Sequence, residues 1–162
     1  MTDFGALISL LARHKVEFII VGGAAATAHG SARLTEDLDV VYSRSKENIG
    51  RLVVALEGYQ PYPRGAPPGL PFQWSAQTIS NGLNFTLTTS LGSIILLAEI
   101  PGGRSYEDLV NDSFELKVFG VTASCLKLER LIQVKRAAGR PKDLEAIAEL
   151  ELLLNEAGKQ SG

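Results

Sequence analysis

Hydrophobic and polar residues follow one another along the first third of the chain in patterns that predict helices and strands in turn. Phe4, Leu7 and Leu11 recur at the spacing of one helix face. The run VEFIIV over residues 16–21 is short and almost continuously apolar, as a buried strand is. The predicted elements are a helix over 3–15 capped by Thr2, a strand over 16–21, a short helix over 24–29, a strand over 37–42 and an amphipathic helix over 45–56. This βαβα opening predicts a mixed α/β core.

The rest of the chain predicts further short strands and then two helices. Residues 60–71 hold five prolines and two glycines, which predicts a loop. The stretch 72–80 is ambiguous between coil and a short helix that carries Trp74. The elements predicted after it are strands over 84–89 and 93–100, a helical turn over 105–110, strands over 114–119 and 121–124, a helix over 125–138 and a last helix from Pro141 to about residue 157. We expect a single domain over residues 1–162, with a core over 16–124 and a C-terminal helical pair over 125–157.

The composition is that of an ordinary globular protein, and it argues against several classes. Of the 162 residues, 45% are hydrophobic and 21% are charged, with a net charge of −2, so binding through a strongly basic surface is not expected, although a local basic patch stays open. Cys125 is the single cysteine, which excludes an internal disulfide and a Cys-based zinc site. No apolar run approaches the ~20 residues of a membrane span, and the N-terminus lacks the pattern of a signal peptide. We therefore expect a cytoplasmic protein with no membrane partner.

The most informative segment joins a glycine pair to two aspartates. Gly22 and Gly23 end the first predicted strand, and there backbone N–H groups can approach a phosphate without a Cβ in the way. Thirteen residues later, Asp37 and Asp39 share one face of the next strand, because side chains alternate with a period of two. Two carboxylates there can hold Mg²⁺ together with substrate phosphates. Two further polar residues approach the same predicted pocket, Arg33 and Thr35. Taken alone, the aspartates are also compatible with the solvated side of an edge strand.

A second cluster of charge precedes the last predicted helix. Residues 127–142 hold six bases and one acid, whereas residues 143–156 hold five acids and no base. A solvated helix pair accounts for most of these charges, since acids in a first helical turn also interact favourably with the helix dipole. Pro141 marks a break between the helices, where backbone N–H groups are free and cationic side chains can grip a triphosphate. We therefore favour a functional role for four residues around this break, Lys135, Arg140, Lys142 and Asp143.

The two segments together resemble a known family. The pair Gly22-Gly23, followed after thirteen residues by Asp37-x-Asp39, resembles the signature of the polymerase-beta-type nucleotidyltransferase superfamily. More narrowly, VGGAAATAHGSARLTEDLDVV and LERLIQVKRAAGRPKDLEAIAEL are similar to the AbiEii/AbiGii-type nucleotidyltransferases, over about residues 16–150. These include toxins of bacterial abortive-infection and toxin–antitoxin systems. The resemblance implies a mixed β-sheet of the nucleotidyltransferase type flanked by helices, Mg²⁺ dependence, and transfer of a nucleotide from an NTP to an acceptor hydroxyl. The implied partners are the nucleoside triphosphate, an RNA, protein or small-molecule acceptor, and a cognate antitoxin.

The resemblance also implies roles for single residues. In the resembling toxins, the stretch that matches Lys135 and Arg140-x-Lys142-Asp143 supplies nucleotide-binding bases and an acid close to the chemistry. The predicted catalytic residues are Asp37, Asp39 and Asp143, and the predicted metal ligands are Asp37 and Asp39. The predicted nucleotide-binding residues are Gly22, Gly23, Arg33, Thr35, Lys135, Arg140 and Lys142.

One position departs from the superfamily pattern. Its members generally place a third carboxylate on a later strand beside the Asp-x-Asp pair, and in the matching run LGSIILL that position is Ile95. Isoleucine can neither ligate a cation nor accept a proton. Glu99 has the same strand parity but lies roughly 13 Å further along. Either Asp143 serves as the missing base, or Asp37 and Asp39 hold one metal ion without a third acid. Two alternatives stay open: a degenerate member that binds a nucleotide or partner without transfer, and an interaction module whose aspartates are solvated surface.

Overall fold

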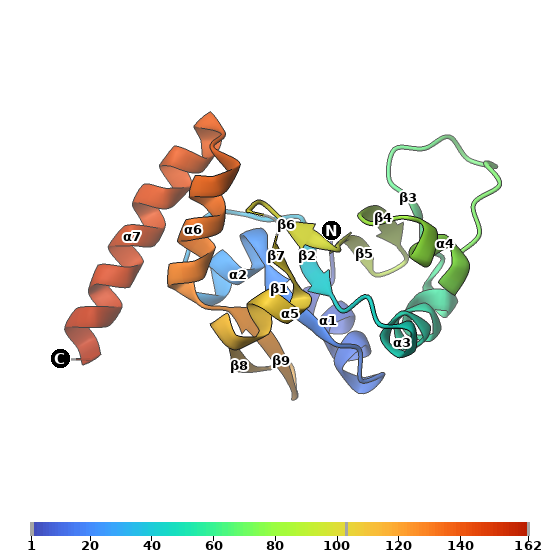
Figure 1. Ribbon diagram of the computed structural model, residues 1–162, viewed down its shortest axis with the longest axis horizontal. Coiled ribbons are helices and arrows are strands. Elements are labelled where there is room, and N and C mark those ends of the chain that lie inside the picture. The colour runs from blue at the N-terminus through green and yellow to red at the C-terminus, as the bar shows by residue number, and fades with distance from the viewer. Residues whose placement is uncertain (1, 103, 162) are drawn as a thin grey trace.

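The structure is a computed structural model that describes residues 2–102 and 104–161, and in it helices flank a seven-stranded mixed sheet (Figure 1). The elements up to the middle of the chain are α1 (Phe4–Arg13), β1 (Phe18–Val21), α2 (Gly22–Ala28), β2 (Asp37–Tyr42), α3 (Lys46–Leu56), η1 (Glu57–Tyr59), β3 (Tyr62–Pro63), α4 (Ala76–Asn81) and β4 (Phe85–Thr89). The others are β5 (Gly92–Leu97), β6 (Glu99–Ile100), β7 (Arg104–Ser105), α5 (Tyr106–Leu109), η2 (Val110–Asp112), β8 (Ser113–Val118), β9 (Val121–Leu126), α6 (Leu128–Ala138) and α7 (Pro141–Ser161). The strand order β3-β4-β5-β2-β1-β9-β8 confirms the predicted mixed α/β fold.

Strand β2 lies in the middle of the sheet, and its alternating sequence separates a packed face from an open one. Leu38 and Val40 are fully buried, and they are in register with Ile94 and Leu96 of the parallel strand β5, which are also fully buried. Residues 37 and 39 of the same strand are only partly buried. Strand β2 therefore buries Leu38 and Val40 on one side of the sheet and places the two aspartates on the other.

The N-terminal helix is capped differently from the prediction. Asp3 caps α1, because its Oδ1 accepts a hydrogen bond from the Ala6 backbone N–H at 2.9 Å. The prediction of Thr2 as the cap is wrong: its hydroxyl donates to the Glu36 carbonyl and accepts from the Ser93 backbone N–H at 3.0 Å. Thr2 therefore ties the start of the chain to the sheet near β2 and β5.

The helical pair begins later than predicted, because β9 continues through Leu126. Cys125 is paired in the sheet with Ile20 on one side and Phe114 on the other, and burial raises the pKa of its thiol to about 12. Gly139, at φ +64, ends α6 in the left-handed region, and α7 follows at once. Figure 1 shows α6 and α7 packed together on one side of the molecule. None of the described helices is long and apolar enough to cross a membrane.

The proline-rich stretch is a loop with one short strand in it. The strand β3 pairs with β4, so that Pro63 lies opposite Leu87 at the edge of the sheet. Trp74 lies before α4 rather than in it, and its indole N–H donates to the Val53 carbonyl at 3.0 Å. The predicted strand over 93–100 ends at Leu97, and β6 forms a separate ribbon with β7. The loop and α4 lie at the end of the molecule opposite to α6 and α7 (Figure 1).

Candidate active site

The two aspartates of β2 stand beside the position where the superfamily pattern has a third acid. Asp37 is in register with Ser93 of β5, and Asp39 is in register with Ile95. Ile95 lines the same cavity as the two aspartates. Glu99 belongs to the separate ribbon, is exposed and is absent from the cavity lining. The described residues therefore place hydrocarbon, and no carboxylate, next to Asp39 on β5.

The glycine pair closes tightly on the strand that carries the aspartates. Gly22 has φ +62, a conformation that L side chains rarely adopt, and a Cβ built on it would lie 2.9 Å from Cγ of Asp39 and closer still to its Oδ2. A Cβ on Gly23 would lie 2.7 Å from the Thr35 hydroxyl. A side chain at either position would displace its neighbour, so both glycines are required by close approach.

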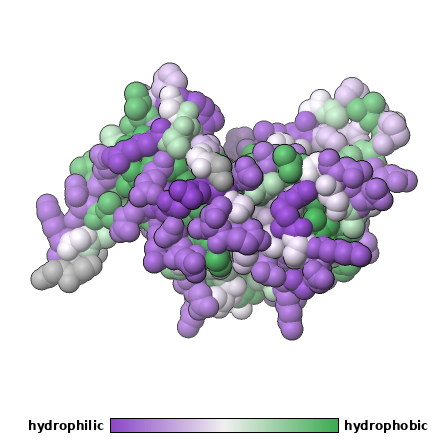
Figure 2. All heavy atoms as spheres, viewed as in Figure 1, coloured by the Kyte–Doolittle hydropathy of each residue, from purple (hydrophilic) through white to green (hydrophobic). Residues whose placement is uncertain are grey.

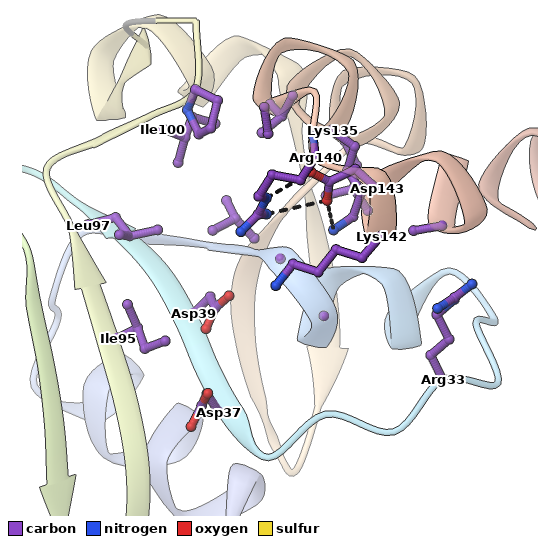
Figure 3. Close-up of a pocket in the computed structure, with 18 residues that line it drawn as sticks. Arg33, Asp37, Asp39, Ile95, Leu97, Ile100, Lys135, Arg140, Lys142 and Asp143 are labelled. Atoms are coloured by element: carbon purple, nitrogen blue, oxygen red, sulfur yellow. Dashed lines mark hydrogen bonds and ion pairs between the residues drawn. The ribbon is translucent and has the colours of Figure 1, made fainter. Parts of the chain in front are cut away.

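A cavity of about 450 Å³ joins these residues to the C-terminal helices, and Figure 3 shows it in close-up. It lies between the sheet on one side and α6 and α7 on the other. Nine of the ten predicted site residues line it, namely Gly22, Gly23, Arg33, Asp37, Asp39, Lys135, Arg140, Lys142 and Asp143. The rest of the lining is apolar, from Val21, Ile95, Leu97, Ile100, Pro101, Leu131, Val134, Ala138 and Ala146. In the space-filling view the outline is notched between the helix pair and the rest of the molecule (Figure 2).

Two predicted nucleotide-binding residues lie differently from the prediction. Thr35 does not line this cavity; it lies behind Gly23, where its hydroxyl donates to the Asp37 carbonyl at 3.2 Å. Arg33 reaches the rim, but its guanidinium lies 3.6 Å from Glu149 and 3.7 Å from Glu145 of α7. Figure 3 shows Arg33 on the loop at the far end of the cavity from the two aspartates. Thr35 and Arg33 are thus bonded to residues around the cavity, and neither side chain faces its centre.

Asp143 lines the cavity with its carboxylate already engaged. The side chain is 2% exposed, and its Oδ2 accepts from the Arg140 backbone N–H at 3.1 Å and from Arg140 Nε at 2.8 Å. Lys135 Nζ lies 3.8 Å from Oδ1. The hydrogen bonds from Arg140 hold the pKa of Asp143 below its usual value. Asp143 is thus an ionised group that fixes two cationic side chains in place (Figure 3).

The cationic side of the cavity is formed by α6 and the start of α7. Figure 3 shows Arg140 and Lys142 extending from the break between the helices into the space above Asp39. Lys142 is exposed and makes no hydrogen bond or ion pair with the described residues. Lys135 is close enough to Asp39 to lower the pKa of its carboxyl. Three cationic groups therefore face the two carboxylates of β2 across one gap.

Asp39 is the most perturbed acid of the site. Burial, and then the charge of Asp37, raise its pKa from 3.8 to about 6, although Lys135 and Arg64 act in the opposite direction. A carboxylate whose charge is this poorly compensated gains much from a bound cation. Perturbed acids of this kind cluster at functional sites.

One residue of the site was missed by the sequence analysis. Arg64 follows β3 in the proline-rich loop, and its Nη1 lies 2.5 Å from Asp37 Oδ1. The two residues are 27 positions apart in the chain and three strands apart in the sheet. No local pattern marks this arginine, because only the pairing of β3 with β4 brings it to the sheet.

The donors present fit a divalent cation bound together with a polyphosphate. Asp37 and Asp39 offer hard carboxylate oxygens at the cavity, and Gly22, which has no Cβ, lets the Asp39 carboxylate lie directly against the backbone bend. Within residues 2–102 and 104–161, no three His, Cys, Asp or Glu side chains cluster as a metal site. The protein thus offers two carboxylates, and phosphate oxygens and water are the ligands that Mg²⁺ commonly keeps besides protein carboxylates.

Comparisons with known proteins address the fold. No protein-family model matches the chain, and no curated protein sequence matches it. Among solved structures, it is similar to a candidate nucleotidyltransferase from Thermotoga maritima, with a TM-score of 0.55 and 16% sequence identity. The match covers 93% of this chain and 89% of that chain. At 16% identity, the similarity is evidence for the fold only, and it shows that the chain has the nucleotidyltransferase fold.

Proposed function

We propose that this protein is a nucleotidyltransferase that binds an NTP with Mg²⁺ in the cavity and transfers a nucleotidyl group to an acceptor hydroxyl. The observation that carries the proposal is the approach of the Gly22 bend to the Asp39 carboxylate, opposite a wall of three cationic side chains. A gap with carboxylates on one side, cations on the other and free backbone between them suits a metal-bound triphosphate. The fold of the Thermotoga maritima protein supports the same conclusion.

Each group has a part that its position suggests. Asp37 and Asp39 would hold the cation, which when bound supplies positive charge for the oxygens of the triphosphate. Arg140 and Lys142 reach the same space and would bind the phosphates, compensating the charge that develops on the leaving pyrophosphate. The apolar walls exclude water from part of the gap. Most of the catalytic effect then comes from positioning and charge compensation.

We propose a positioning role for Asp143 in place of the general base that the absence of a third acid at Ile95 suggested. Its carboxylate accepts hydrogen bonds from Arg140 on both oxygens and is held ionised by them. A base with a lowered pKa is a weak proton acceptor. By fixing Arg140 and Lys135, it instead keeps two cations aimed at the phosphates.

The finer parts of the proposal rest on the sequence motifs. The similarity to AbiEii/AbiGii-type proteins suggests a toxin of an abortive-infection or toxin–antitoxin system, with an RNA, protein or small-molecule acceptor. Because the sheet and the C-terminal helices form the cavity together, we also propose that residues 1–162 act as one nucleotidyltransferase-like domain.

The proposal is tested by incubating the protein with Mg²⁺, each α-labelled NTP, and total RNA or lysate. We expect label to appear on one acceptor class, and at least one NTP with Mg²⁺ to raise the melting temperature. Both effects should disappear in Asp39→Asn, which removes a ligand of the cation. Stabilisation without transfer would favour the degenerate binder, and the absence of stabilisation by any NTP would contradict both.

That second function, nucleotide binding without transfer, is favoured by one specific observation. Ile95 occupies the register position beside Asp39 where the superfamily has an acid. The same position offers a direct test, because its side chain already lines the cavity.

Ile95→Asp is expected to add a third oxygen ligand and to tighten Mn²⁺ binding about tenfold, equivalent to about 1.4 kcal/mol. Titration of the purified protein with Mn²⁺ at pH 8 measures it, with Ile95→Val as the apolar control that leaves affinity unchanged. Transfer that appears only in Ile95→Asp identifies the natural chain as a degenerate binder. Transfer in both proteins supports the enzyme, and unchanged Mn²⁺ affinity contradicts the placement of the cation at Asp39.

A further inference from the structure

The proline-rich loop carries an arginine that the proposed reaction has not used. Arg64 directly follows β3, and its backbone N–H donates to the Thr86 carbonyl of β4 at 3.0 Å. Thr86 is in turn in register with Ile95 of β5, which is in register with Asp39. The arginine is therefore anchored to the sheet along the row that ends at the aspartates.

The side chain of Arg64 ends on one of the two carboxylates proposed for the cation. Its Nη1 lies 2.5 Å from Asp37 Oδ1, in a pair whose side chains are 44% and 25% exposed. A guanidinium at this distance from a carboxylate makes a charge-assisted hydrogen bond. One of the four carboxylate oxygens of the aspartate pair is thus occupied from within the protein.

Two effects follow from this contact. Asp37 and Asp39 are like charges on one face of β2, and the guanidinium of Arg64 lies against Asp37, where its positive charge reduces their repulsion. Arg64 also covers the oxygen that a cation at the pair would use, and a guanidinium and a metal ion cannot both bind that oxygen at full strength. The arginine therefore stabilises the site without a cation and competes with the cation for it.

We propose that Arg64 is an internal counter-ion of the aspartate pair. Its guanidinium neutralises Asp37 when no cation is bound and must move away from Asp37 when a cation binds. The inference rests on the proposed function, since it takes Asp37 and Asp39 as the cation ligands. Cation binding is then coupled to release of an arginine whose backbone stays fixed to β4. The affinity for the free cation is lower than the two carboxylates alone would give.

Arg64→Gln tests this role of Arg64 directly in the 162-residue protein. Titration of the nucleotide-free protein with Mn²⁺ at pH 8, followed by calorimetry or by the EPR signal of free Mn²⁺, is expected to show about fivefold to tenfold tighter binding in the variant. Arg51→Gln is the matched control. Arg51 makes a comparable exposed ion pair with Glu17, at 3.1 Å, and it does not line the cavity. Its Mn²⁺ affinity should equal that of the wild type.

A second readout is independent of affinity. Without a cation, Arg64→Gln leaves the two aspartates less compensated, so its melting temperature should fall below that of the wild type and recover when Mn²⁺ is added. Equal or weaker Mn²⁺ binding in Arg64→Gln, while Asp37→Asn abolishes binding, would contradict the counter-ion role of Arg64 and leave the proposed function intact. If neither the wild type nor any variant binds Mn²⁺, the cation site itself is refuted, and the counter-ion role of Arg64 is refuted as well.

Discussion

Replacing Asp39 with asparagine is expected to abolish nucleotidyl transfer and, at pH 8, to make the protein more stable. Asp39 is the acid that faces the Gly22 bend, and a neutral amide of the same shape cannot hold a divalent cation there. Loss of such an electrostatic group lowers turnover by roughly 10²–10³-fold. We expect the label-transfer rate to fall by at least about 100-fold on this basis.

The gain in stability comes from the pKa of Asp39. The value is 3.8 in a model peptide and about 6 in the folded protein, so the native state holds the proton more tightly than the unfolded chain. Between these two pH values the wild type therefore loses stability as the pH rises, because the native state is forced to carry a poorly compensated charge. Asparagine carries no such charge. At 1.36 kcal/mol per pKa unit, the variant should gain up to about 3 kcal/mol at pH 8 and almost nothing near pH 4.

Thermal unfolding of both proteins from pH 4 to pH 8 measures this gain. The matched control is Asp37→Asn, which should also lose cation binding but gain less stability than Asp39→Asn, since the relief of its repulsion with Asp39 is offset by the loss of its ion pair with Arg64. A variant Asp39→Asn that is less stable than the wild type at pH 8 would show that the carboxylate is already well compensated in the fold. A gain of equal size at every pH would show that it does not arise from ionisation.

Gly22→Ala is expected to disable the site although it changes no charged residue. Alanine at φ +62 costs about 1–2 kcal/mol, and its Cβ would lie 2.9 Å from Cγ of Asp39. The strand cannot move away, because Val21 and Asp39 are paired in the sheet. The carboxylate must therefore swing out of its position. We expect the melting temperature to fall by several degrees and the stabilisation by NTP with Mg²⁺ to disappear.

Two glycine controls separate the collision from the backbone strain. Gly120 also has a positive φ, +75, but a Cβ there meets nothing within 4 Å, so Gly120→Ala should lose stability and keep the NTP response. Gly50 lies inside α3 with open space around it, and Gly50→Ala should gain up to about 1 kcal/mol. Thermal unfolding with and without NTP and Mg²⁺ compares the three variants. A full NTP response in Gly22→Ala would show that nucleotide binding does not depend on the close approach of Gly22 and Asp39.

Much of the secondary structure was predictable, because its signals are local. The strand over 37–42 has the predicted bounds, since the alternation of aspartates with Leu38 and Val40 defines both its type and its buried face. The errors fall at ends of elements. Cys125 was assigned to a helix, but the sheet extends to Leu126 because β1 and β8 offer it partners on both sides. Pairing of this kind depends on distant residues and leaves no mark in the local pattern.

The candidate site was predictable where the motif itself carries geometry. The motifs place Gly22-Gly23 at one strand end and Asp37-x-Asp39 on the next strand, and nine of the ten residues predicted for the site line one cavity, while their roles stay predictions. Arg64 and the indirect position of Thr35 were not predictable. An arginine in a proline-rich loop is ordinary in sequence, and its place beside Asp37 depends on three successive strand pairings.

The amino-acid order alone thus determined the type of most main elements and the shared face of the two aspartates. These follow from backbone sterics and from the period of a strand, which act between near neighbours. The tertiary structure decided what surrounds the carboxylates: the Gly22 bend lies against Asp39, Arg64 contacts Asp37, and Asp143 is engaged by Arg140. Charge compensation depends on distances between side chains that are remote in the chain, so only the folded arrangement could assign these residues their parts.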